Sequence, residues 1–177
     1  MVDANVLESV FLDRDGTLIK PIIKNNKSIA IDKIEKLEYY QDTLKGISLL
    51  KKKYKIFMVT NQPDVITNGY SKKEVIKINE KIKRDLNLED YICCFGTKQT
   101  DPFNYKPGPG MILDLKEKYK IDLSKSFFIG DRDSDMMAAK NAGSNGVMID
   151  RKMNEITINA TTTVKSFLQA CKYIINK

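Results

Sequence analysis

The chain has 177 residues, 42% of them hydrophobic and 30% charged, a composition typical of a globular protein with one core. It contains no histidine, which excludes Ser-His-Asp and Cys-His hydrolysis in their usual forms and histidine-ligated zinc. The net charge of +7 suits an anionic small molecule or simply reflects a lysine-rich composition. A nucleic-acid partner usually needs a concentrated basic stripe, and along most of this chain the lysines alternate with acidic residues.

Short apolar runs alternate with helical patterns along the chain. Strands are predicted at residues 10–12, 55–60, 91–95, 127–129 and 147–149, and helices at residues 109–119 and 134–142. Asp42 is expected to cap a further helix. Its residues Leu44, Ile47 and Leu50 recur at helical spacing.

Capping signals mark the other helix ends. Ser71 and Glu74 have the spacing of a capping box, so a helix is expected to begin there. Gly143 is expected to end the helix before it, and Thr163 to cap the last helix. Alternating strands and helices predict an α/β fold with a central parallel sheet and helices on both faces. No repeat or linker interrupts the pattern, so residues 1–177 are expected to form a single domain.

Polar residues follow the predicted strands, at the edge where parallel sheets bind ligands. Asp13 and Asp15 come directly after the first strand, and Gly16 permits a tight turn there. Thr60 and Asn61 stand at the end of the second strand. Each group alone would be an ordinary surface turn.

Two further groups join this set. Asp131 and Asp135 lie in an acidic cluster after the fourth strand, and Lys106 stands beside a glycine- and proline-rich turn. Taken singly, such acids are ordinary helix caps and such a lysine is solvated. Clustered carboxylates repel one another unless a cation lies between them, and a site with only oxygen ligands suits Mg²⁺. With a lysine, a hydroxyl and an amide nearby, the set predicts phosphoryl-transfer chemistry that needs no histidine.

Four motifs occur in order: FLDRDGTL, VTNQ, KPGPGM and GDRDSDMMAAKNAG. They resemble the motifs of the haloacid dehalogenase-like (HAD) phosphatases, in particular the group that holds D-glycero-D-manno-heptose 1,7-bisphosphate phosphatase and histidinol-phosphate phosphatase. The resemblance implies a Rossmannoid three-layer sandwich. Residues 18–54 are too few for a lid domain, so no large cap domain is expected.

The resemblance also implies roles for the acidic residues. Asp13 would be the nucleophile that forms an aspartyl-phosphate, and Asp15 would protonate the leaving oxygen and then activate water. Asp13, the backbone carbonyl of Asp15 and Asp131 would hold Mg²⁺. Gly16 would allow the turn that places Asp15.

Other residues would bind the substrate. Thr60, Asn61 and Lys106 would hold the transferring phosphoryl group, and Asp135 would orient Lys106 or a metal-bound water. Arg14 and Arg132 are candidates for a second anionic group of the substrate. Salt bridging within the site is an open alternative for both arginines.

The sequence departs from this group in two places. The segment GTKQTDPFNY, where relatives carry a Cys/His zinc loop, has no cysteine or histidine, so no zinc is expected. Tyr105 stands where those enzymes often have an arginine. Both differences affect the assignment of the substrate, whereas the residues expected to carry the reaction are present.

The best single substrate is therefore a heptose bisphosphate, dephosphorylated at position 7. Histidinol phosphate, a nucleic-acid 3′-phosphate and a non-catalytic binding role stay open as alternatives. A small phosphorylated molecule is the expected partner, with no membrane or nucleic-acid partner, and the protein is expected to be a monomer or small homo-oligomer. Cys93, Cys94 and Cys171 lack CxxC spacing and read as free thiols, and with an acidic N-terminus they favour the cytoplasm.

Overall fold

The computed structural model describes residues 6–25, 27–151 and 159–177. Its centre is a six-stranded sheet of order β5-β4-β1-β6-β7-β8, and every neighbouring pair is parallel. The strands are β1 (Ser9–Leu12), β4 (Lys55–Asn61), β5 (Asp90–Cys94), β6 (Phe127–Gly130), β7 (Asn145–Ile149) and β8 (Thr162–Val164). The predicted strands are confirmed to within a few residues.

Successive residues of the central strands face opposite sides of the sheet, as the pleat of a strand requires. In β1, Val10 and Leu12 belong to one buried cluster, and Phe11 between them belongs to the other. In β6, Phe127 and Ile129 lie in the first cluster and Phe128 in the second. The sheet therefore has an apolar core on each face, which explains why its strands are apolar throughout.

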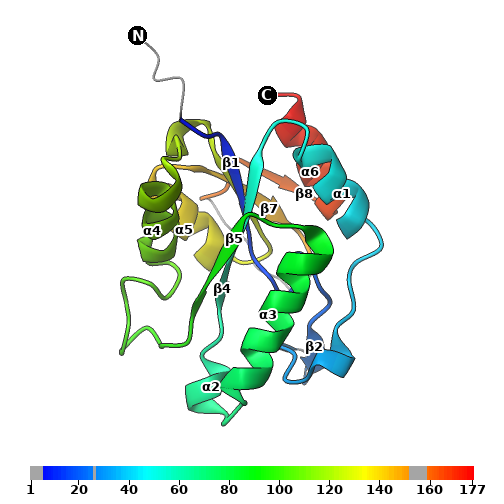
Figure 1. Cartoon of the computed structure of the whole chain (residues 1–177), viewed down its shortest axis with the longest axis vertical. Helices are drawn as coiled ribbons and strands as arrows, with labels where there is room; N and C mark the ends of the chain where they lie inside the picture. Colours follow the sequence, from blue (N-terminus) through cyan, green and yellow to red (C-terminus); the bar gives the residue numbers. More distant parts are fainter. Residues whose placement is uncertain (1–5, 26, 152–158) are drawn as a thin grey trace.

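Helices cover both faces (Figure 1). The first core includes residues of α1 (Thr43–Leu50), α3 (Lys72–Leu86) and α6 (Phe167–Ile175). The second core includes residues of α4 (Gly110–Tyr119) and α5 (Asp133–Ala142). The three-layer α/β fold predicted from the sequence is confirmed.

A hairpin and a short helix lie at the end of the sheet where β1 and β4 terminate (Figure 1). The described residues between β1 and β4 form an antiparallel hairpin, β2 (Ile22–Lys24) with β3 (Lys27–Ile29), a short 3₁₀ turn at Ile34–Lys36, and α1. The short helix α2 (Asp64–Thr67) follows β4. In Figure 1 the hairpin and α2 lie at the lower end, where the strands β1 and β4 run out, and the C-terminus lies at the upper end. The described residues here contain no cap domain.

Two predictions at helix starts were wrong. Thr163 does not cap a helix, because the β-branched run around it pairs with β7 as strand β8. The last helix begins at Phe167 instead, and the Ser166 hydroxyl accepts a hydrogen bond from the Gln169 backbone N–H at 3.2 Å.

Asp42 precedes α1, as predicted, but its side chain does not cap that helix. Its Oδ2 accepts a hydrogen bond from the backbone N–H of Leu168, 2.9 Å away in the first turn of α6. Leu44, which recurs at helical spacing with the buried Ile47 and Leu50, is exposed. Asp42 thus ties the start of α1 to α6, and both helices cover the same face of the sheet.

None of the described helices has both the length and the apolar character that crossing a membrane requires.

Gly46 lets α1 pack closely against α6, and we predict that Gly46→Ala destabilises the fold. A Cβ at this position would lie 2.6 Å from the buried ring of Phe167 and 2.9 Å from the sulfur of Cys171. The overpacking should lower the free energy of unfolding by about 1–2 kcal/mol, after the gain in helix propensity is subtracted. Urea unfolding measures the change. Lys45→Ala, at an exposed position of α1, is the control, and an equal effect of the two substitutions would contradict the prediction.

Candidate active site

Three neighbouring strands deliver the predicted site residues to one edge of the sheet. Asp13 follows β1, Thr60 and Asn61 end β4, and Asp131 follows β6. Because β1 lies between β4 and β6 in the sheet, Asp13 is flanked on one side by a hydroxyl and an amide and on the other by a second acid. The topology alone therefore brings these side chains together.

Three carboxylates form a buried cluster. One oxygen from each of Asp13, Asp131 and Asp135 lies within 4.8 Å of the others. Burial is the main cause that raises the pKa of Asp13, to about 6, and it raises the pKa of Asp131 well above its usual value, with the neighbouring carboxylates adding to both shifts. The Asp131 Oδ1 atom is buried without a hydrogen-bond partner among the described residues. Buried, mutually repelling carboxylates with an unpartnered oxygen suit a divalent cation, so these residues fit a metal site.

Gly16 makes room for this cluster. Its backbone φ of +85° is one that residues with a side chain rarely adopt. A Cβ at this position would lie 2.0 Å from Asp131 Oδ2. The glycine was predicted to place Asp15, and the structure adds the close approach of Asp131 to the same turn. The side chain of Asp15 does not belong to the carboxylate cluster.

Lys106 is the cation within the cluster. Its buried ammonium group donates to Asp13 Oδ1 at 2.6 Å and to the carbonyl of Val59 at 3.0 Å, and it lies 2.7 Å from Asp135 Oδ1. Burial lowers the pKa of Lys106, but the carboxylates of Asp13 and Asp135 outweigh it, so the pKa lies above its usual value. The lysine is therefore charged, and the contact with Asp135 is compatible with the orienting role that the resemblance implies for that residue.

Asn61 holds the backbone of the same lysine. Its Oδ1 accepts from the Lys106 N–H at 3.0 Å, and its Nδ2 donates to the Lys106 carbonyl at 3.2 Å. The Nδ2 group has a second hydrogen beyond the one donated to the Lys106 carbonyl, and Asn61 lines the cleft, so its contact with a phosphoryl group stays a prediction. Thr60 is buried beside it, lines the cleft, and accepts a hydrogen bond from Gln62 Nε2 at 2.9 Å.

Arg14 does not face the cleft, contrary to its prediction as a substrate-binding residue. Its side chain is fully buried and donates to Asp15, Gln62 and Asn79 at 2.7–2.8 Å. The alternative left open by the sequence, salt bridging within the site, is what the structure has. The Asp15 Oδ2 accepts from Arg14 Nε and from Gln62 Nε2, and its Oδ1 is buried without a partner among the described residues.

A cleft of about 510 Å³ opens over these groups. Its walls include Asp13, Asp15, Thr60 and Lys106, with the β2–β3 hairpin on one side and α2 on another. Arg132 is exposed at the wall, where its guanidinium group donates to the carbonyl of Ser28 in the hairpin at 3.2 Å. An anionic group of a substrate can therefore reach Arg132 but not Arg14.

Residues 25–143 match the haloacid dehalogenase-like hydrolase family. The chain is 30% identical to D-glycero-alpha-D-manno-heptose-1,7-bisphosphate 7-phosphatase of Photorhabdus laumondii over 152 residues, which span 78% of this chain and 80% of that protein. The chain belongs to the haloacid dehalogenase-like hydrolase family.

Other proteins are similar to this chain too. The histidine biosynthesis bifunctional protein HisB of Buchnera aphidicola is 32% identical over 149 residues, which span 81% of this chain but 41% of HisB. The fold matches the crystal structure of D,D-heptose 1.7-bisphosphate phosphatase from B. bronchiseptica, complexed with magnesium and phosphate. The TM-score is 0.81 at 18% identity, with 96% of this chain and 99% of the other covered. These similar proteins include phosphatases, and this chain is a phosphatase-type hydrolase.

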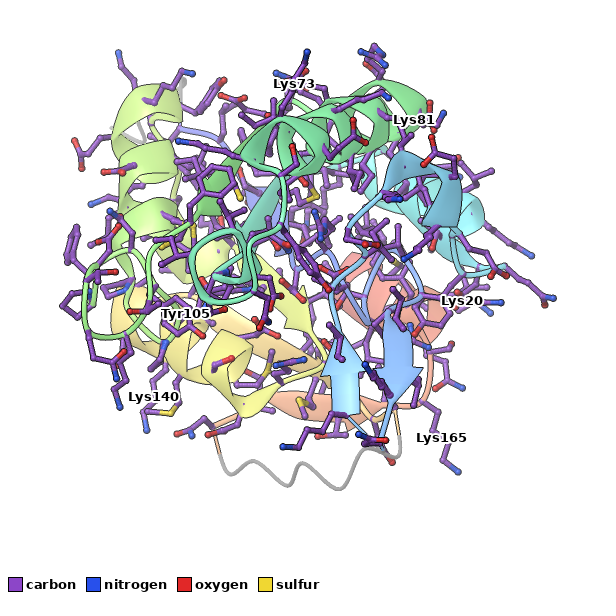
Figure 2. The ribbon with its side chains drawn as sticks, turned by 90° about the horizontal axis from the view of Figure 1, so that it is seen from below. Lys20, Lys73, Lys81, Tyr105, Lys140 and Lys165 are labelled. Atoms are coloured by element: carbon purple, nitrogen blue, oxygen red, sulfur yellow. The ribbon has the colours of Figure 1, made fainter. Side chains whose placement is uncertain are left out.

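Within the HAD fold, hydrogen bonds organise the loop at residues 96–105. The Asp101 carboxylate accepts from the backbone N–H and the side-chain amide of Asn104 at 3.1–3.2 Å, and the Cys94 thiol lies 3.7 Å from it. The loop leads into Tyr105, which lines the cleft beside Lys106. Figure 2 looks at this end of the molecule, with Tyr105 near the short helix α2. The hydroxyl groups of Thr97 and Thr100 make further hydrogen bonds within the same loop, so polar side chains hold it together.

Two residues of this HAD site were missed from the sequence. Gln62 belongs to the VTNQ motif but received no role, and Asn79 was not singled out at all. Asn79 is fully buried on the α3 face that also carries Val75 and Ile82. A polar residue within an apolar helical stripe is a signal that could have found it, because a buried amide needs hydrogen-bond partners.

We predict that Gly16→Ala weakens divalent-cation binding by about tenfold or more, because the added Cβ displaces a carboxylate of the proposed metal site. Gly143→Ala is the matched control, since Gly143 has the same φ of +85° but its Cβ would meet nothing within 4 Å. Titration calorimetry with MgCl₂ measures the affinity of each variant. Equal affinities of the two variants would contradict the prediction.

Proposed function

We propose that this HAD phosphatase is a Mg²⁺-dependent hydrolase of a phosphorylated sugar that acts through an aspartyl-phosphate. The observation that carries the proposal is the contact of Lys106 with Asp13, next to the carboxylates of Asp131 and Asp135. A nucleophile, a fixed cation and a set of metal ligands then share one cleft, as phosphoryl transfer requires.

The proposed nucleophile is Asp13. Lys106 donates to its Oδ1, so Oδ2 is the oxygen that would attack phosphorus. Asp15, on the wall of the same cleft, would give a proton to the leaving oxygen and then take one from the attacking water. Thr60, Asn61 and Lys106 would donate hydrogen bonds to the transferring phosphoryl group.

Mg²⁺ would be held by Asp13, Asp131 and the backbone carbonyl of Asp15, with Asp135 as a further oxygen within reach of the cluster. When bound, it supplies positive charge that balances the phosphoryl oxygens. No zinc is proposed, since the segment at residues 96–105 contains no cysteine or histidine.

The best candidate substrate is D-glycero-D-manno-heptose 1,7-bisphosphate, hydrolysed at the 7-phosphate. The 30% identity to a heptose-1,7-bisphosphate 7-phosphatase over 80% of that protein supports it. The exposed Arg132 on the cleft wall is the proposed contact for the second phosphate. Histidinol phosphate is the second candidate, supported by the similarity to HisB, of which the chain spans 41%.

A nucleic-acid 3′-phosphate is the weakest candidate. Of the lysines labelled in Figure 2, Lys73 and Lys81 lie along α3 and Lys140 lies on the opposite side of the view, and Lys20 is paired with Glu38. We also propose that residues 1–177 act as one domain, that the protein works in the cytoplasm as a monomer or small homo-oligomer, and that its partner is the small phosphorylated substrate.

We predict that Asp13→Asn abolishes turnover, because an amide oxygen is a far weaker nucleophile than a carboxylate. Phosphate release should fall on the order of 10³-fold or more. Asp114→Asn, an exposed position on α4, removes the same charge elsewhere and should keep full activity. An active Asp13→Asn variant would contradict the aspartyl-phosphate mechanism.

A substrate screen tests the rest of the proposal. Phosphate release is measured with heptose bisphosphate, sugar monophosphates, histidinol phosphate and a 3′-phosphorylated oligonucleotide, each with Mg²⁺ or with EDTA. We expect the heptose bisphosphate to be hydrolysed fastest and EDTA to stop the reaction. Release from the oligonucleotide alone would overturn the sugar assignment, and full activity in EDTA would overturn the Mg²⁺ assignment.

A further inference from the structure

A basic residue beyond β7 holds the turn that follows β1. Arg151 lies two residues after the end of β7, and its Nε donates to the carbonyl of Gly16 at 2.7 Å. Its Nη2 lies 3.5 Å from the carbonyl of Thr17. In the sheet, β6 lies between β7 and β1, so this side chain connects the ends of two strands that do not pair with each other.

An aromatic ring supports the guanidinium group. The Arg151 Cζ atom lies 3.7 Å from the centre of the Tyr40 ring, a distance at which a guanidinium group is attracted to an aromatic face. Tyr40 belongs to the segment between β3 and α1, and its backbone N–H donates to the carbonyl of Leu18 at 3.3 Å. The ring that supports Arg151 is therefore itself attached to the chain just after the turn.

The turn held in this way carries groups of the proposed metal site. The Gly16 N–H donates to the carbonyl of Ile19 at 2.9 Å and the Gly16 carbonyl accepts from Arg151, so both of its backbone polar groups are engaged. These hydrogen bonds fix the peptide on each side of Gly16, including the one whose carbonyl belongs to Asp15, a proposed ligand of Mg²⁺. The same turn lies against Asp131, whose carboxylate occupies the place of a Gly16 Cβ.

The positive charge of Arg151 does not explain its place beside a metal site. Its hydrogen-bond acceptors among the described residues are carbonyl oxygens and not carboxylates. Together with Asp131 it lines a second cavity, of about 350 Å³. A cation placed there would repel Mg²⁺ and lower its affinity. What Arg151 can contribute to metal binding is therefore the position of the turn.

We propose that Arg151 is a positioning residue for the metal site: through the Gly16 carbonyl it holds the turn after β1 in the form that places the Asp15 carbonyl and Asp131 around Mg²⁺. The inference rests on the proposed Mg²⁺-dependent function. No contact between Arg151 and the metal or the substrate is needed, because the guanidinium group acts on the backbone of the turn.

Magnesium affinity tests this role, because position and charge predict opposite signs. Arg151→Met removes the guanidinium group and its charge but keeps a long side chain. Loss of the positioning contact should weaken Mg²⁺ binding by about tenfold or more, whereas the loss of a repelling charge alone would strengthen it. Titration calorimetry of the EDTA-treated and dialysed protein with MgCl₂ measures the affinity without a substrate. In phosphate-release assays, the Mg²⁺ concentration for half-maximal rate should rise by the same factor, and saturating Mg²⁺ should restore kcat.

Three further variants serve as controls. Lys20→Met removes a cation from the wall of the same cavity, where Lys20 pairs with Glu38, and should not weaken Mg²⁺ binding. Tyr40→Phe keeps the ring beneath the guanidinium group and should bind Mg²⁺ like the wild type. Tyr40→Leu removes the ring and should weaken binding by about threefold. If Arg151→Met does not fold, the two Tyr40 variants decide the test.

Unchanged or tighter Mg²⁺ binding in Arg151→Met would overturn the inference. So would a loss in Lys20→Met as large as that in Arg151→Met, or equal affinities of the two Tyr40 variants. In each of these cases, Mg²⁺ binding and Mg²⁺-dependent phosphate release by the wild type would leave the proposed function standing. A wild type that neither binds Mg²⁺ nor needs it for phosphate release would overturn the proposed function and the inference with it.

Discussion

The contact between Lys106 and the buried carboxylates is the interaction on which the site depends. Asp13, Asp131 and Asp135 carry three negative charges when ionised, and Lys106 returns one positive charge. One divalent cation would balance the two negative charges that remain. Because the site is buried, the attraction between the cation and the carboxylates would be stronger than in water. Lys106 keeps its charge because the acids stabilise it, and the acids tolerate burial because of Lys106.

Parallel topology makes this arrangement possible. Because β1 lies between β4 and β6, the residues after three adjacent strands converge at one edge. Asp13 stands in the middle, Thr60 at its β4 side and Asp131 at its β6 side. The segment between β1 and β4 adds only a hairpin and α1, so the edge remains an open cleft of about 510 Å³. Selectivity then depends on the few side chains of its walls, among which Arg132 is an exposed cation.

The sequence predicts which polar residues follow the strands, but it does not predict in which direction each side chain points. The positions of Asp13 and Asp131 follow from strand ends alone, because parallel strands share an edge. Arg14 stands between two acids in the sequence, yet its side chain is buried, and two of its partners are Gln62, directly after β4, and Asn79 in α3. Asp42 likewise found a partner 126 residues away in α6. Contacts of this kind depend on the packing of distant elements, which local patterns do not encode.

The end of β4 links the two halves of the proposed reaction. Asn61 clamps the backbone of Lys106 through both of its polar atoms, and the next residue, Gln62, donates to Asp15 Oδ2. The second Nε2 hydrogen of Gln62 goes to the Thr60 oxygen, which leaves the Thr60 hydroxyl hydrogen free to donate into the cleft. Three consecutive residues thus fix the cation, the acid and a phosphoryl donor. A shift of this strand end would misplace all three at once, so the buried pairing of β4 with β1 and β5 is itself a condition for catalysis.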